Sequence, residues 1–166
     1  MRRIILKMED FETFYNKQQK KLLPYLIRIT GDYSLSMDIL QESFTKYLEK
    51  YAKETRNVSL LYTIARNNFI DYKRKAGRDL ILEHNHKDPS KNQGENLQIN
   101  QECMLVLEAM KGLKDDEREI MALVITEDLS YEEIASLVGT TRANVKVKVH
   151  RARIKLREIL KTGGLL

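Results

Sequence analysis

The side chains best suited to binding a polyanion lie between Arg142 and Lys161. Eight cations in this segment stand against one acid, Glu158. Guanidinium and ammonium groups neutralise phosphates, and arginine can also pair with the edge of a base. The cations are Arg142, Lys146, Lys148, Arg151, Arg153, Lys155, Arg157 and Lys161. This pattern favours nucleic-acid binding, although an ordinary solvated basic helix would have the same composition.

Two helices must position these cations, and the residues between the helices predict a tight turn. Ser130 and Glu133 have the S-x-x-E spacing of a capping box, so a helix should begin just after Ser130. Gly139 suits a left-handed C-cap, and Thr141 can cap a second helix that begins at Arg142. A short helix, a glycine turn and a second helix predict a helix-turn-helix.

The charge distribution orients this motif. The residues from Asp115 to Glu133 include eight acids and one base, Arg118. We therefore expect the second helix to face phosphates while the acidic side turns away. The candidates for base or near-base contacts are Arg142, Asn144, Lys146 and Lys148, and those for phosphate contacts are Arg151 and Arg153.

A different polar face, acidic in character, lies on the helix expected around residues 37–51. It is formed by Asp38, Gln41, Glu42, Thr45 and Glu49, at i, i+3, i+4, i+7 and i+11. An apolar stripe that contains Met37, Leu40, Phe44, Tyr47, Leu48 and Tyr51 lies opposite. On a chain of net charge +5, an acidic face favours a basic protein partner over DNA. The alternative is an ordinary solvated helix face.

A third polar face, between residues 60 and 78, becomes basic toward its end. Its members are Asn67, Asp71, Arg74, Lys75 and Arg78, which recur at helical spacing. Tyr62, Phe69 and Tyr72 could stack on unpaired bases. Aromatic side chains at such positions are more often core residues, and we favour that interpretation for Phe69.

The composition of the chain excludes several classes of protein. No glycine-rich phosphate loop, H-E-x-x-H motif or nucleophile motif is present, so we expect neither an enzyme nor a cofactor. The single cysteine, Cys103, rules out an internal disulfide and suits a reducing cytoplasm. His84 and His86 lie in a polar stretch, where a solvated loop is a better interpretation than a metal site. No apolar run is long enough to cross a bilayer.

Hydrophobic periodicity predicts an all-α protein with two helical domains. Apolar residues recur at helical spacing up to about residue 75, with a helix stop at residues 30–32. From about residue 76 the pattern is lost in a stretch rich in Gly, Pro, Asn and Ser, and it returns near residue 101. We therefore divide the chain into an N-terminal domain (1–75), a flexible linker (76–100) and a C-terminal domain (101–166).

Both predicted domains resemble those of one family. The run from Leu129 to Gly139 (LSYEEIASLVG), followed by the run from Val145 to Arg157 (VKVKVHRARIKLR), resembles region 4 of extracytoplasmic-function sigma factors. The run from Asp38 to Phe44 (DILQESF) and the run from Leu61 to Arg74 (LYTIARNNFIDYKR) resemble region 2 of that family. The resemblance implies an alternative sigma factor, which directs core RNA polymerase to specific promoters.

The resemblance also implies a role for each polar face. The face from Asp38 to Glu49 would dock on the clamp coiled coil of core polymerase, and the C-terminal domain would contact the flap. The −35 element, as double-stranded DNA, would be bound by Ser130, Thr141, Arg142, Asn144, Lys146, Lys148, Arg151 and Arg153. The melted non-template strand of the −10 element would be bound by Arg56, Asn57, Tyr62, Arg66, Asn67, Asp71, Arg74 and Lys75. The family further implies an anti-sigma partner.

One alternative remains open at this point. A conventional helix-turn-helix regulator would bind an operator as a symmetric dimer, without polymerase. In that case the acidic face from Asp38 to Glu49 would need another explanation.

Overall fold

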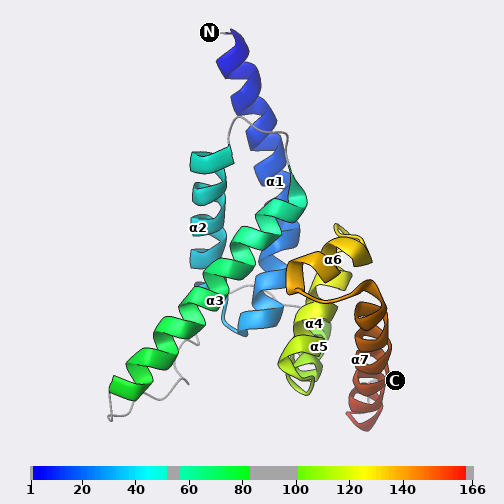
Figure 1. The fold of residues 1–166 in the computed structure, drawn as a ribbon. Coiled ribbons are helices and arrows are strands. Elements are labelled where there is room, and N and C mark those ends of the chain that lie inside the picture. The colour runs from blue at the N-terminus through cyan, green and yellow to red at the C-terminus, as the bar shows by residue number, and fades with distance from the viewer. Residues whose placement is uncertain (1, 52–56, 83–100, 164–166) are drawn as a thin grey trace.

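A computed structural model describes residues 2–51, 57–82 and 101–163, and their side chains over 10–51, 57–78 and 104–163. The described residues form helices joined by short turns, with no strand among them, as predicted (Figure 1). The helices are α1 (Arg2–Thr30), α2 (Tyr33–Tyr51), α3 (Val58–Leu82), α4 (Gln101–Lys111), α5 (Asp115–Ile125), α6 (Tyr131–Val138) and α7 (Arg142–Thr162). Arg56, His84 and His86 lie outside the described residues, as does the side chain of Cys103.

Helices α1, α2 and α3 pack around an aromatic cluster. The rings of Phe14 and Tyr47 stack with centroids 5.4 Å apart, and Phe44 meets Phe14 edge-on at 6.5 Å. The predicted stripe of α2 is buried at Leu40, Phe44 and Tyr47, but Leu48 is 40% exposed. The buried face is shifted by a fraction of a turn from the predicted one, so that Ser36, Ile39 and Ser43 lie inside it instead.

The ends of these helices follow local chemistry. Helix α1 ends at the predicted stop, where Gly31 has φ of 70° and donates its N–H to the carbonyl of Ile27 at 2.9 Å. Asp32 then accepts the N–H of Leu35 at 2.8 Å and so satisfies the start of α2. Helix α3 runs to Leu82, so the linker does not begin at residue 76 as expected. A single glycine, Gly77, costs a helix only about 1 kcal/mol and does not end it.

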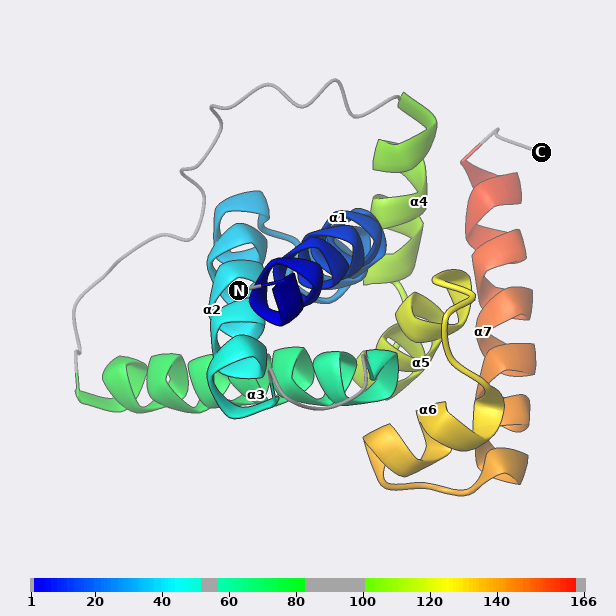
Figure 2. The same ribbon diagram turned by 90° about the horizontal axis from the view of Figure 1, so that it is seen from above.

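The second half of the chain packs directly against the first. Seen from above, α5 lies between α1 and α7, with α4 and α6 on either side (Figure 2). Helix α5 contacts α1, and α6 contacts α3. The buried apolar residues of the two halves form one continuous cluster. Two helical domains are therefore present, but within the described part of the chain they share a core.

Candidate nucleic-acid interface

The predicted helix-turn-helix is formed by α6 and α7. Ser130 accepts the N–H of Glu133 at 3.2 Å, and the Glu133 carboxylate accepts the N–H of Ser130 at 2.7 Å, which completes the capping box. Gly139 takes the left-handed conformation at φ 71° and ψ 44°. Thr141 then accepts the N–H of Asn144 at 3.2 Å and caps α7. All three signals were recognised in the sequence, because each acts within a few residues of the chain.

The capping bonds define what Ser130, Thr141 and Asn144 do in this structure. The hydroxyls of Ser130 and Thr141 hold helix ends, and the Asn144 amide donates to the Thr140 hydroxyl at 2.7 Å. Since a hydroxyl can donate while it accepts, Ser130 and Thr141, both exposed, can still donate to a phosphate.

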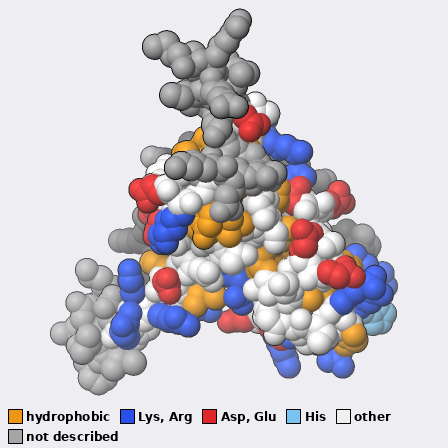
Figure 3. Space-filling view, turned by 45° about the horizontal axis from the view of Figure 1, so that its top comes forward, with side chains coloured by type: hydrophobic (Ala, Val, Ile, Leu, Met, Phe, Trp, Pro, Cys, Tyr) orange, Lys and Arg blue, Asp and Glu red, His pale blue; other side chains and the backbone are white. Residues whose placement is uncertain are grey.

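The cations of α7 fall into two sets. One set is exposed and consists of Arg142, Lys146, Arg151, Arg153, Arg157 and Lys161. Of these, Arg142 is paired with Glu132, with Nε and Oε1 2.7 Å apart. Lysine and arginine side chains gather over this part of the molecule and, separately, over the far end of α3 (Figure 3). The exposed set forms the surface that a polyanion would meet.

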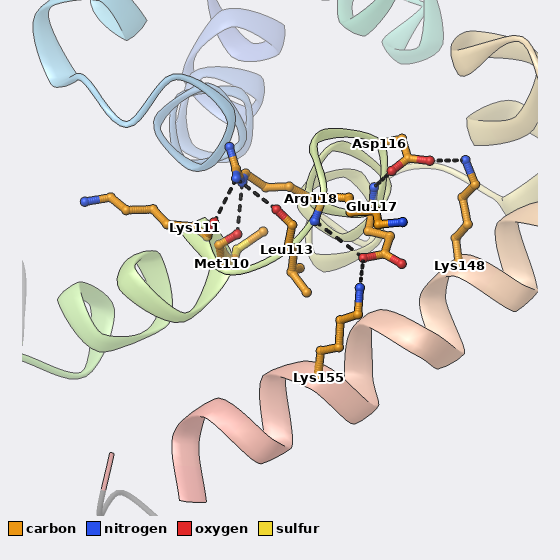
Figure 4. A network of polar contacts seen from close by, with 9 residues as sticks. Met110, Lys111, Leu113, Asp116, Glu117, Arg118, Lys148 and Lys155 are labelled. Carbon is orange, nitrogen blue, oxygen red and sulfur yellow. Dashed lines mark hydrogen bonds and ion pairs between the residues drawn. The ribbon is translucent and has the colours of Figure 1, made fainter. Parts of the chain in front are cut away.

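The other set turns inward and binds the acids of α5. Lys148 donates to the carboxylate of Asp116, and Lys155 donates to that of Glu117 at 2.7 Å (Figure 4). These hydrogen bonds lower the pKa values of Asp116 and Glu117, against the effect of burial. Lys148, predicted to lie near bases, is thus occupied by a partner in its own domain. The segregation of charge expected from the sequence is therefore incomplete.

A second polar network holds α4 on α5. The guanidinium of Arg118 donates to the carbonyls of Met110, Lys111 and Leu113 at 2.9 to 3.0 Å (Figure 4). The last carbonyls of a helix have no partner within it, so Arg118 satisfies the end of α4. Together with Lys148 and Lys155, it fixes α5 as the element on which α4 and α7 are oriented.

The predicted −10 residues lie on two sides of α3. Asn67, Asp71, Arg74 and Lys75 are exposed, and the last three line an open hollow together with Arg78. Tyr62 is fully buried, so its ring is not offered to a base in this arrangement, whereas Tyr72 is 47% exposed. Phe69 is half-buried, and Lys73 lies over its ring at 5.6 Å.

Two other members of this set bind residues of other helices. Arg66 donates from Nε and Nη2 to the two oxygens of Glu119, at 2.6 and 3.3 Å. Asn57 caps α3 by accepting the N–H of Leu60 at 3.1 Å, and its own N–H donates to the Tyr47 hydroxyl at 2.7 Å. No signal in the sequence indicated the pairing of Arg66 with Glu119, because the two residues are 53 positions apart.

The acidic face of α2 is placed as the spacing predicts. Asp38, Gln41, Glu42, Thr45 and Glu49 are all exposed, on the side of α2 away from Leu40, Phe44 and Tyr47. Glu42 pairs with Lys46 one turn further along, and the Thr45 hydroxyl donates to the carbonyl of Gln41 at 2.9 Å. Lys46 also donates to Asn68 of α3 at 2.6 Å, which ties this helix to the next.

Comparison with known proteins identifies the class. Residues 14–79 match the family model of Sigma-70 region 2, and residues 103–156 match that of Sigma-70, region 4. The chain therefore belongs to the sigma-70 family, and its relatives place it among the alternative sigma factors of the extracytoplasmic-function group. These matches do not support the alternative of a dimeric operator-binding regulator.

Curated relatives and solved structures extend along most of the chain. The RNA polymerase sigma factor YlaC of Bacillus subtilis is 29% identical, over 90% of this chain and 91% of its own. The extracytoplasmic-function factor SigM of the same organism is 25% identical, over 92% of this chain and 96% of its own. The sigma factor RpoE of Bartonella quintana, solved in complex with the anti-sigma factor NepR, superposes with a TM-score of 0.73 at 26% identity. That superposition covers 92% of this chain and 98% of RpoE.

Within the described residues, no helix combines the length and the apolar character needed to cross a membrane.

Proposed function

We propose that this chain binds core RNA polymerase through the acidic face of α2 and through its C-terminal domain, and so directs the enzyme to promoters. Regions 2 and 4 match in this order on one chain, and this observation carries the proposal. The exposed carboxylates of Asp38, Glu42 and Glu49 supply the charge for a basic protein surface. The work of the protein is then in the cytoplasm, in contact with polymerase and DNA rather than in catalysis.

In this proposal α7 enters the major groove of the −35 element. Its exposed cations from Arg142 to Arg153 would contact phosphates and base edges, with Arg142 released from Glu132 on binding. The exposed side of α3, with Asn67, Arg74 and Lys75, would hold the −10 strand as it opens. Two modest sites on one chain reinforce each other, because binding at one raises the effective concentration at the other.

Run-off transcription tests this function. Core polymerase from the source organism would be supplied with a library of genomic fragments, with and without the protein. We expect discrete transcripts only when the protein is added, and their loss in Glu42→Lys. Glu12→Lys is the matched control, because Glu12 is an exposed acid on α1, outside the α2 face. Added protein that yields no transcripts would contradict the proposed function.

The DNA contacts of α7 are tested with the promoters so found. Arg151→Ala should lower the affinity of the holoenzyme for promoter DNA and flatten its salt dependence, since one phosphate contact is removed. Lys161→Ala, an exposed cation near the end of α7, should leave both quantities unchanged. Equal effects of the two substitutions would mean that only the net charge of the helix matters.

A further inference from the structure

The outward side of α7 carries apolar side chains along its centre. This side lies opposite the one that packs against α4, α5 and α6. Val147 is 45% exposed there, and Ile154 is 41% exposed. The central line of exposed side chains, at i, i+4, i+7 and i+11, is formed by Ala143, Val147, His150 and Ile154. Three of these four side chains have no polar atom, on a helix whose other exposed residues are mostly charged.

Exposed cations stand on both sides of this central line. Lys146 lies on one side of Val147 and Arg151 on the other. Phosphates line the two rims of the DNA major groove, and the base edges form its floor, which is about 12 Å wide. A helix that fills the groove directs its flanking side chains to the phosphates and its central line to the bases. Val147 therefore has the position on α7 from which a side chain meets base edges.

The polar side chains near the start of α7 do not fill this central position. The amide of Asn144 donates to the Thr140 hydroxyl at 2.7 Å, within the turn that precedes the helix. The ammonium of Lys148 donates to the carboxylate of Asp116 on α5. Both groups are thus held toward the protein. Val147 is the largest side chain on the central line within the first two turns of α7.

The chemistry of valine decides which base edge suits this position. The C5-methyl of thymine is the apolar group that base pairs present in the major groove. Contact between this methyl group and valine removes apolar surface of both partners from water. Over guanine or adenine, valine would cover polar atoms without replacing their hydrogen bonds with water, which disfavours those bases. The branched side chain of valine is also stiff, so little freedom is lost on contact.

We propose that Val147 is a specificity-determining residue of the −35 interface, which selects thymine through contact between its methyl groups and the C5-methyl of the base. The proposal rests on the proposed function, which places α7 in the major groove of the −35 element. The flanking cations bind the DNA backbone whatever its sequence, and Val147 adds a preference that phosphate contacts do not supply. Ala143, one turn earlier, is small and lets the helix come close to the floor of the groove.

Selection from a randomised −35 element measures the preference. A promoter from the run-off experiment is randomised through its −35 element, and the templates that the holoenzyme binds are sequenced. Wild type should select thymine at one position, and Val147→Ser should lose that preference while the other positions are selected as before. Ile154→Ser is the matched control, because Ile154 is an exposed apolar residue about 10 Å further along the same line. It should select as wild type does, since residues near the start of a recognition helix reach the bases.

Replacement of the selected thymine by deoxyuridine removes its methyl group and keeps its pairing with adenine. Wild-type holoenzyme should bind the dU promoter about fourfold more weakly than the dT promoter, which corresponds to about 0.8 kcal/mol for one buried methyl group. Val147→Ser holoenzyme should bind the two promoters equally, because the apolar contact is already lost. The Tm of Val147→Ser should equal that of wild type, since this side chain is exposed.

Three results would overturn the methyl contact. The first is a wild-type selection that prefers thymine at no position of the −35 element. The second is equal affinity of the wild-type holoenzyme for dT and dU promoters, which would show that no methyl group is contacted. The third is an equal loss on dU substitution in wild type and in Val147→Ser, which would assign the methyl contact to another side chain.

Selection by the full chain alone, from random duplex DNA, separates this proposal from the proposed function. If the holoenzyme gives no transcripts but the chain alone selects a thymine that Val147→Ser no longer prefers, the methyl contact stands and the proposed function fails. If transcripts appear and Val147→Ser changes no preference, the proposed function stands and the methyl contact is wrong. A chain that selects no sequence, alone or with core polymerase, would overturn both.

Discussion

At the scale of single residues, partners within the chain decide which of the predicted DNA-contacting side chains are free to bind a ligand. Relations between residues close in the sequence were predictable: the spacing of Asp38, Glu42 and Glu49 indicated one exposed face, and all three side chains are exposed. Ion pairs between residues distant in the sequence could not be predicted. The sequence contains many acids that could face Arg66 or Lys148, and only the fold selects Glu119 and Asp116. Burial of Tyr62 has the same origin, because it depends on a domain contact.

The two buried tyrosines Tyr25 and Tyr47 make a matched test of hydrogen bonding. Both are fully buried, but the Tyr47 hydroxyl accepts the N–H of Asn57, whereas the Tyr25 hydroxyl has no partner in the described structure. Tyr47→Phe should lower the free energy of unfolding by about 1 kcal/mol. Tyr25→Phe should leave it unchanged or raise it by up to about 1 kcal/mol, because a desolvated hydroxyl is removed. Urea denaturation of the two variants checks this, and an equal loss in both would contradict it.

The pairing of Glu117 with Lys155 predicts a loss of stability in acid. The Lys155 ammonium lowers the pKa of the Glu117 carboxyl in the folded protein below its ordinary value. A group with a depressed folded pKa stabilises the fold above its ordinary pKa and loses that contribution as the pH falls through the folded value. Lys155→Met should therefore destabilise the protein by about 1 to 3 kcal/mol at neutral pH and much less in strong acid. Chemical denaturation at several pH values checks the difference, and a pH-independent effect would contradict it.

At the scale of elements, helix ends marked by a capping residue or a glycine turn were predictable from the sequence, whereas the end of α3, which has no such signal, was not. The Ser130 box, Gly139 and the Thr141 cap were all predicted, since each signal needs only its own neighbours. The extension of α3 to Leu82 was missed, because residues 76–82 have no clear apolar period. Helix α1 continues through Pro24 to the stop that the sequence predicts at residues 30–32. Tertiary packing commonly overrides such weak local signals.

Glycines at two helix positions should respond oppositely to alanine. Gly139 has φ of 71°, where a Cβ costs about 1 to 2 kcal/mol, so Gly139→Ala should lower the stability of the C-terminal domain by that amount. Gly77 lies within α3, and a Cβ there would meet nothing within 4 Å. Gly77→Ala should raise stability by about 0.5 to 1 kcal/mol. Thermal denaturation distinguishes them by the sign of the shift in Tm, and a fall in both would show that Gly77 has a constraint of its own.

At the scale of the whole molecule, the arrangement of the domains could not be predicted from the sequence. The loss of pattern after residue 76 indicated two domains joined by a linker, and each domain is present as expected. Their contact depends on side chains that are unremarkable in sequence, such as Lys21, Tyr25 and Glu119. This contact joins the hydrophobic cores of the two domains into one. It also partly covers α3, the helix that carries most of the −10 candidates, with the C-terminal domain.

A shared core should make the two domains unfold together. The contact of α1 with α5, with Tyr25 and the Arg66–Glu119 pair at the boundary, couples their stabilities. Wild-type protein should therefore give one calorimetric transition, and Gly139→Ala should shift the whole of it. Glu119→Arg should uncouple the domains and give two transitions, because the paired charges then repel. When Gly139→Ala is added to the Glu119→Arg variant, it should lower the temperature of only one of the two transitions, since its strain is confined to the C-terminal domain. Two transitions in the wild-type protein would mean that the boundary between the domains is too weak to couple their unfolding.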